Sequence, residues 1–193
     1  MLDSKKMSPY NLLYLILLVD RDIPKLRSAL HDLAYFCHSY IPKIDDMDFE
    51  PHYRGPYSAQ LSVMLVEMIS CSFIDENTRP GPAHQRYHYL LSDAGKRLAL
   101  AAKARHEREC GQIVHVVGTC NSMTGLHPDR LSQAAKVHYI SKEHNTGSVD
   151  EILEHAPEYG WQMEKTDVAA GIDLVKTLED MAQTGRPASV PAH

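Results

Sequence analysis

The chain has 193 residues, of which 44% are hydrophobic, so it can bury one large core or two small ones. Its formal net charge is -5, and the acidic excess lies in the second half. Residues 1–108 carry 14 Lys and Arg against 13 Asp and Glu, whereas residues 109–193 carry 6 against 12. This balance excludes a strongly basic nucleic-acid-binding domain, and any DNA contact must depend on a local basic patch.

Cysteine usage and hydropathy predict a cytoplasmic protein. The four cysteines form no CxxC pair, which is typical of reduced thiols. The N-terminal segment lacks the pattern of a signal peptide, because Asp20 and Arg21 stand where a small-residue cleavage site would follow. The apolar run from Leu12 to Val19 is far shorter than the roughly 20 residues of a membrane span, so we expect no membrane partner.

Two helices are predicted at the N-terminus. Ser8-Pro9 supplies a cap and a proline at the first helical position, and the nearly all-apolar helix that follows is expected in the core. Asp22-Ile23-Pro24 repeats this start signal for a second helix, which Ile41-Pro42 ends. The charged residues expected to point outward from this second helix are Lys25, Arg27 and Asp32.

The segment that follows predicts a short extended stretch and a third helix. Phe49 to Tyr53 forms the extended stretch, and Gly55-Pro56-Tyr57-Ser58 is a turn that runs into the helix. Apolar residues recur at i, i+3, i+4, i+7 and i+8 from Leu61, so one face is buried. The residues left for solvent or a ligand are Ser58, Gln60, Ser62 and Glu67.

A β-hairpin and a fourth helix come next. A strand begins at Phe73, a loop with two prolines and a glycine covers residues 77–85, and residues 86–91 alternate as the returning strand. Ser92 caps a helix that runs to about Arg108. This order predicts a winged helix-turn-helix core over residues 8–108, with the hairpin as its wing.

The second half predicts a helical extension over residues 109–182, packed on the core or on a second subunit. Residues 112–117 form a short apolar run that a loop over residues 118–128 interrupts, and further helices are expected around residues 131–140, 149–155 and 166–181. Residues 183–193 have no core former except Val190 and are expected to be a disordered tail. The fold class is therefore mainly α with a small β-hairpin.

Three of these segments carry a family resemblance. With the Gly55-Pro56-Tyr57-Ser58 turn, the Phe73-Ile74 strand start and the Leu91-Ser92-x-x-Gly95-x-x-Leu98 helix start, the chain resembles the YwgA-like winged-helix proteins of bacteria and archaea. The similarity extends through residues 134–140 to the turn at residues 159–161. The resemblance implies a winged-helix fold over most of residues 10–180, and DNA binding or regulation only by analogy of fold.

The start of the third helix is the first candidate DNA contact. The residues concerned are Arg54, Tyr57, Ser58 and Gln60. Helix N-termini bind phosphate, Arg pairs with phosphate or guanine, and Gln pairs with adenine. The alternative is that the tyrosine packs the turn and the glutamine is merely exposed, because residues 56–74 contain no Lys or Arg.

The hairpin is the second candidate contact. Its basic residues are Arg79, His84, Arg86 and His88, and Lys96 follows on the next helix. Alternation places Arg86 and His88 on one face of the returning strand. Phosphate contact and an ordinary solvated surface are equally good interpretations of these residues.

Metal and catalytic motifs are not evident. Among the 12 histidines, His84 and His88 have i, i+4 spacing, but this spacing joins ligands only on a helix and here crosses from a loop into a strand. We therefore predict no metal site and no cofactor. The polar segment 118–125 contains Cys120, which is better explained as part of a loop than as a nucleophile, so no enzymatic activity is predicted.

Two functions from different classes remain. The first is a dimeric, DNA-binding transcriptional regulator, with the third helix at the major groove of double-stranded DNA and the wing on its backbone. The alternative is a winged-helix protein-interaction module, such as an adaptor or an antitoxin-like partner, that does not bind DNA. Exposure of the third helix and convergence of the basic residues beside it would distinguish them.

Overall fold

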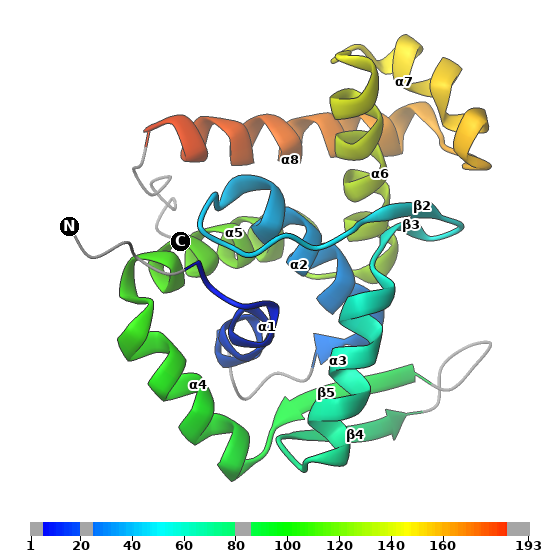
Figure 1. The fold of residues 1–193 in the computed structure, drawn as a ribbon. Coiled ribbons are helices and arrows are strands. Elements are labelled where there is room, and N and C mark those ends of the chain that lie inside the picture. The colour runs from blue at the N-terminus through cyan, green and yellow to red at the C-terminus, as the bar shows by residue number, and fades with distance from the viewer. Residues whose placement is uncertain (1–5, 20–24, 80–85, 185–193) are drawn as a thin grey trace.

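The computed structural model describes residues 6–19, 25–79 and 86–184 (Figure 1). Over these ranges the chain is mainly helical with a small antiparallel sheet. The elements in order are α1 (Pro9–Leu18), β1 (Lys25–Leu26), α2 (Arg27–Tyr40), β2 (Glu50–His52), β3 (Gly55–Tyr57), α3 (Ala59–Ser70), β4 (Ile74–Arg79), β5 (Arg86–Leu91), α4 (Asp93–Arg105), α5 (Glu107–Thr124), α6 (Pro128–His144), α7 (Val149–His155), the 3₁₀ helix η1 (Ala156–Tyr159) and α8 (Lys165–Thr184). Within the described ranges, no helix has both the length and the apolar character needed to cross a bilayer.

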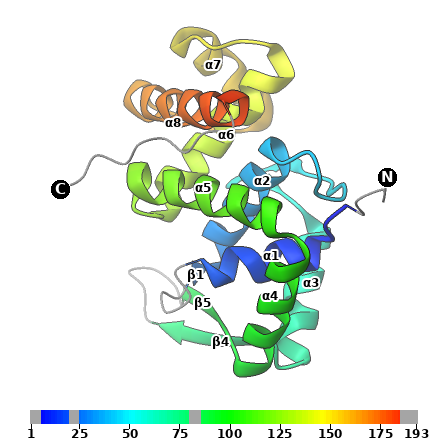
Figure 2. The ribbon, with the colours of Figure 1, turned by 90° about the vertical axis from the view of Figure 1, so that its left-hand side faces the viewer.

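Helix α1 lies at the centre of one half of the molecule, as its composition predicts. The Ser8 hydroxyl caps it by accepting a hydrogen bond from the Asn11 amide. It carries no charged residue, and seven of its ten residues are buried. Helices α2, α4 and α5 and strand β5 surround it (Figure 2).

Helix α2 begins later than the sequence suggests. The expected start at residues 22–24 lies outside the described residues, and the helix begins at Arg27 after Lys25 and Leu26 have formed β1. Lys25 and Asp32 are buried, so the expectation that both point to solvent is wrong. Strand β5 and helices α5 and α6 cover α2 on several sides, and its buried face is therefore wider than a single apolar stripe.

The predicted hairpin is present and belongs to a three-stranded sheet. The strand order is β1-β5-β4, with both pairs antiparallel, and the register of the hairpin runs from Ile74↔Leu91 to Arg79↔Arg86. Its first strand continues to Arg79, whereas the sequence placed the loop from residue 77. Residues 80–85 lie outside the described part of the chain.

A second hairpin replaces the predicted turn before α3. Gly55, Pro56 and Tyr57 form β3, which pairs with β2 in the register Glu50↔Tyr57 to His52↔Gly55. The chain reverses at Tyr53 and Arg54, and Ser58 then caps α3. The expectation of a turn over residues 55–58 is therefore wrong, because these residues pair with the extended segment before them.

The C-terminal half contains the expected helices, but α5 is longer than predicted. The helix runs unbroken from Glu107 to Thr124, so the expected loop from residue 118 is wrong. Val116, Val117 and Cys120 continue one buried face, while Gly118 is exposed and no atom beyond its own helix lies near it. The helix ends where Gly125 adopts a left-handed backbone with φ of 62°.

Two groups of buried apolar side chains hold these layers together. The larger group includes side chains from α1 to α5 and also from α6 and α8, so it extends across residue 108. The smaller group lies among α6, α7, η1 and α8, which stand together at the top of Figure 1. Trp161 is its largest side chain and is almost fully buried.

A pair of glycine substitutions tests this packing. A Cβ atom on Gly95 would lie 2.0 Å from the Phe73 carbonyl oxygen, whereas one on Gly118 would meet nothing within 4 Å. We expect Gly95→Ala to lower the free energy of unfolding by about 3 kcal/mol or more through steric overlap with backbone. Gly118→Ala should raise it by about 0.5–1 kcal/mol, because alanine favours an exposed helix interior. Urea denaturation of both variants measures the difference, and equal effects would contradict the close approach of α4 to residue 73.

Candidate interaction surface and metal-binding residues

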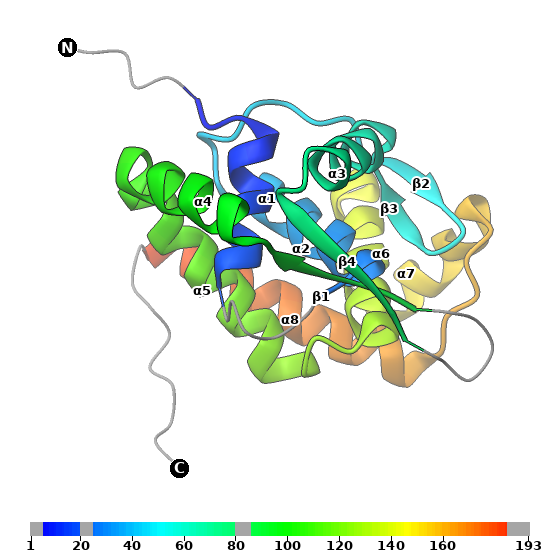
Figure 3. The same cartoon turned by 90° about the horizontal axis from the view of Figure 1, so that it is seen from below.

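The outer side of α3 is uncovered by the rest of the described chain. Its inner side is buried, and the helix lies at an edge of the molecule (Figure 3). Val63 and Val66 on the outer side are 56% and 55% exposed. The remaining exposed residues of the helix are Ala59, Gln60, Glu67 and Ser70. This side therefore presents apolar and neutral groups with one carboxylate.

Tyr10 of α1 adjoins this surface. Its hydroxyl donates a hydrogen bond to the Glu67 carboxylate, and its side chain is 36% exposed. The hydrogen bond to Glu67, with its negative charge, raises the pKa of Tyr10. We define the α3 face as Tyr10, Ala59, Gln60, Val63, Val66 and Glu67.

Two of the predicted contact residues at the start of α3 make internal contacts. Ser58 is fully buried, and its hydroxyl accepts a hydrogen bond from the Leu61 amide. Tyr57 stacks on His31 with ring centroids 5.0 Å apart and donates to the Ser62 hydroxyl over 2.9 Å. Ser58 and Ser62 are therefore not left for solvent as expected, while Gln60 is exposed as expected.

Arg54 lies in the exposed turn between β2 and β3, where the C-terminal half holds it. Its guanidinium is 3.1 Å from a carboxylate oxygen of Asp129, and the Ser132 hydroxyl donates to its backbone carbonyl. The Trp161 indole donates to the carbonyl of His52 in the same hairpin over 2.6 Å. The hairpin is thus fastened to α6 and to the segment before α8, and Arg54 has a carboxylate partner.

The residues predicted in the wing are only partly brought together. Arg79 and Arg86 are the last register pair of the hairpin, next to the segment that contains His84, which lies outside the described residues. His88 is half-buried in β5, and Lys96 on α4 pairs with Asp93 over 3.4 Å. Figures 1 and 3 show both hairpins extending toward one side of the molecule, away from α4. The turn that contains Arg54 therefore lies on the same side as the β4–β5 hairpin, whereas the helix that carries Lys96 does not.

A buried polar group lies beneath the β2–β3 hairpin. Burial raises the pKa of Asp32 well above its usual range, and the charges of Arg54 and Lys136 oppose this rise only in part. Asp32 Oδ2 has no hydrogen-bond partner among the described residues. The Lys136 ammonium lies 5.8 Å from the centre of the Trp161 ring, and burial lowers its pKa. These ionisable groups contribute to the interior rather than to a surface site.

Sequence spacing missed one group with the chemistry of a metal site. His144, His155 and Glu158 offer ligand atoms that all lie within 4.8 Å of one another, and they are the only such group found in the described ranges. The two histidines are separated by the loop between α6 and α7, so their proximity is a property of the fold. The i, i+3 spacing of His155 and Glu158 was the signal in the sequence.

A pocket of about 280 Å³ lies between α5 and the end of α8. Its lining includes Arg108 and His115, together with apolar side chains of both helices. None of the residues predicted as a site lines it.

Comparison with known proteins leaves the family open. No protein-family model matches the sequence, and no curated protein matches it either. The resemblance to the YwgA-like proteins therefore stays a prediction, and function must follow from the chain's own surfaces.

Buried histidines make the stability of this protein sensitive to pH. Burial, with a smaller effect of Lys142, lowers the pKa of His138 to about 4, and its Nδ1 lies 2.7 Å from the Tyr35 hydroxyl. The unfolded chain binds this proton at about pH 6.5, so the stability that His138 contributes is complete above that pH and is lost as the pH falls toward 4. When the pH falls from 6.5 to 4.5, we expect the wild-type protein to lose about 2 kcal/mol more stability than the His138→Gln variant.

Urea denaturation of both proteins at each pH checks this expectation. Asp32 acts with the opposite sign, because its raised pKa makes the folded state bind the proton more strongly. The difference between variant and wild type therefore isolates His138. Parallel pH profiles for the two proteins would contradict the assignment.

Proposed function

We propose that this chain is a winged-helix protein-interaction module whose contact surface is the α3 face. The order α1, β1, α2, α3 and then the β4–β5 hairpin, with β1 added to its returning strand, supports a winged-helix arrangement. The β2–β3 hairpin departs from it, because it stands between α2 and α3 where a short turn is usual.

The exposure of Val63 and Val66 carries this proposal. Single exposed valines are common, but these two lie three residues apart on one helix, next to Glu67, which accepts a hydrogen bond from Tyr10. No Lys or Arg lies between residues 56 and 74 to meet phosphate, and the charge of this surface comes from Glu67. Such a surface suits apolar side chains of a protein partner better than a nucleic-acid backbone.

The partner that fits best is an amphipathic helix of another protein. Small apolar side chains spaced by one turn could lie over the two valines, as when two helices pack side by side. The net charge of -5 and the carboxylate of Glu67 favour a neutral or basic partner. The hairpin fastened to α6 holds the start of α3 in place, so the surface is formed before the partner binds.

The variant Val63→Lys/Val66→Lys tests the α3 face. Both side chains are more than half exposed, so we expect little change in the melting temperature but at least a tenfold loss of partner binding. A photo-crosslinking residue at Gln60, used in the cells that make the protein, captures the partner, which mass spectrometry identifies. Purified partner then gives the dissociation constants.

A matched control is Val114→Lys, since Val114 is 47% exposed on α5 and lies outside the α3 face. It should leave partner binding unchanged. The proposal would be contradicted if crosslinking at Gln60 persisted in the double variant. It would also be contradicted if the Val114→Lys control reduced crosslinking as much as the double substitution does.

DNA binding through the wing is the second candidate. It is favoured by the positions of Arg79 and Arg86, which are opposite each other in the backbone register at the end of the hairpin, and by the β2–β3 hairpin, which carries Arg54 in its turn and extends toward the same side. We expect Arg79→Ala/Arg86→Ala to weaken binding to all duplex sequences alike and to reduce the salt slope by about 2, one for each phosphate contact. Titration of random duplex DNA from low to physiological salt measures both quantities. Absence of binding at low salt would eliminate this candidate.

A further inference from the structure

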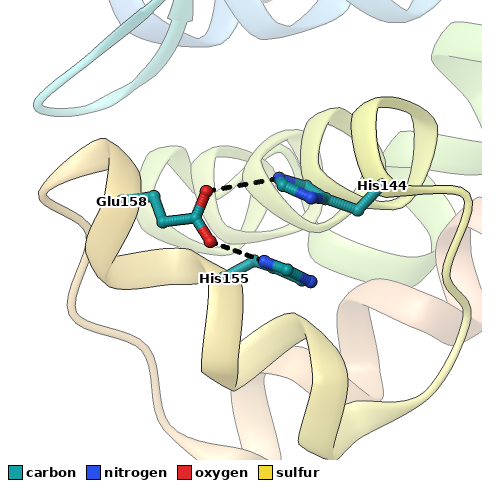
Figure 4. Close-up of side chains that lie close together, drawn as sticks. All are labelled: His144, His155 and Glu158. Carbon is teal, nitrogen blue, oxygen red and sulfur yellow. Dashed lines mark hydrogen bonds and ion pairs between the residues drawn. The ribbon is translucent and has the colours of Figure 1, made fainter.

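Two histidines and a glutamate converge at the far end of the C-terminal helices. His144 lies at the end of α6, His155 at the end of α7 and Glu158 in η1. Both imidazoles turn a nitrogen toward the same carboxylate (Figure 4). His155 Nδ1 is 2.6 Å from Glu158 Oε1, and His144 Nε2 is 3.8 Å from Glu158 Oε2.

We propose that His144, His155 and Glu158 bind one divalent transition-metal ion, zinc above all. Two imidazole nitrogens and a carboxylate oxygen are ligands that zinc takes in proteins. Calcium and magnesium prefer oxygen ligands, so the two imidazoles argue against them. Zinc–nitrogen bonds are about 2.0–2.1 Å long, so the ligand atoms, now within 4.8 Å of one another, must move inward. One of the two stacked imidazoles must also turn, because a bound ion lies in the plane of each ring.

The two imidazoles contact each other and a tyrosine. Their rings are stacked with centroids 3.7 Å apart, and the Tyr159 hydroxyl lies 2.9 Å from His144 Nε2. Tyr159 in turn stacks on Trp161, the largest side chain of the smaller core. An ion that takes both imidazoles must therefore part the stacked rings and replace the tyrosine hydroxyl at Nε2.

Solvent can reach the group. The side chains of His144, His155 and Glu158 are 22%, 30% and 54% exposed, so an ion can arrive from solution and water can complete its coordination. An ion bound here would connect α6 to α7 and η1 across the loop of residues 145–148. We therefore assign it a structural role, stabilising the C-terminal helices.

Zinc titration of the chelator-treated full chain tests the site. A Cys71→Ser background removes the exposed thiol as a competing ligand. We expect one zinc ion per chain by calorimetry, and cobalt should give weak visible bands without thiolate charge-transfer absorption. His144→Ala and His155→Ala should each weaken zinc binding at least tenfold, and Glu158→Gln, which keeps a hydrogen-bonding side chain, should weaken it as well.

His127→Ala is the matched control, because His127 is exposed at the start of α6 and lies outside the group. It should bind zinc as the background protein does. Far-UV circular dichroism of each metal-free variant separates loss of the site from loss of the fold, and Glu158→Gln provides the test if a histidine variant unfolds. Absence of one-to-one binding, or equal affinity in the variants and the control, would overturn the proposal.

Discussion

The burial of α1 is the constraint on which the rest of the structure depends. A ten-residue helix without a charged side chain must be enclosed, because exposing it would leave several large apolar side chains in water. Helices α2, α4 and α5 and strand β5 provide this enclosure. Helix α3 contributes its inner side to the larger core and leaves its outer side exposed. Its outer valines are therefore free for another molecule without any cost to the central core.

The C-terminal half positions α3 although it does not cover it. The Ser132 hydroxyl and the Trp161 indole donate hydrogen bonds to backbone carbonyls of the β2–β3 hairpin. Helix α3 begins two residues after the last residue of β3 that pairs with β2. Gly55 suits this hairpin because its φ of 130° is a backbone conformation that residues with a side chain rarely adopt. The larger core continues from the first half into α6 and α8, which supports the same connection. The two halves are thus joined by packing and by hydrogen bonds, and the start of α3 is set by both.

The sequence predicted the features that depend on neighbouring residues. Ser8 and Ser92 cap helices as predicted, and apolar periodicity located α3, α6 and α8. What it missed depends on distant contacts: β3 is fixed by β2 and α6, and Asp32 is buried by elements far along the chain. Residues 118–124 continue α5 instead of forming the expected loop, because the exposed Gly118 costs the helix only about 1 kcal/mol, which the burial of Val117 and Cys120 outweighs. Sequence spacing could not predict that His144 lies beside His155, because their proximity also depends on how distant segments pack.

The distribution of charge favours the α3 face over the wing. Arg54 and Lys96 pair with Asp129 and Asp93, and Lys136 lies in the interior near Asp32 and Trp161. Arg79 and Arg86 are then the cations of the wing strands, but β4 also carries exposed Asp75 and Glu76. The formal charges of these two strands therefore cancel, which gives the strands little net attraction for phosphate. Apolar contact needs no such field, so the partner binding that we propose for the exposed valines of α3 should depend only weakly on salt concentration.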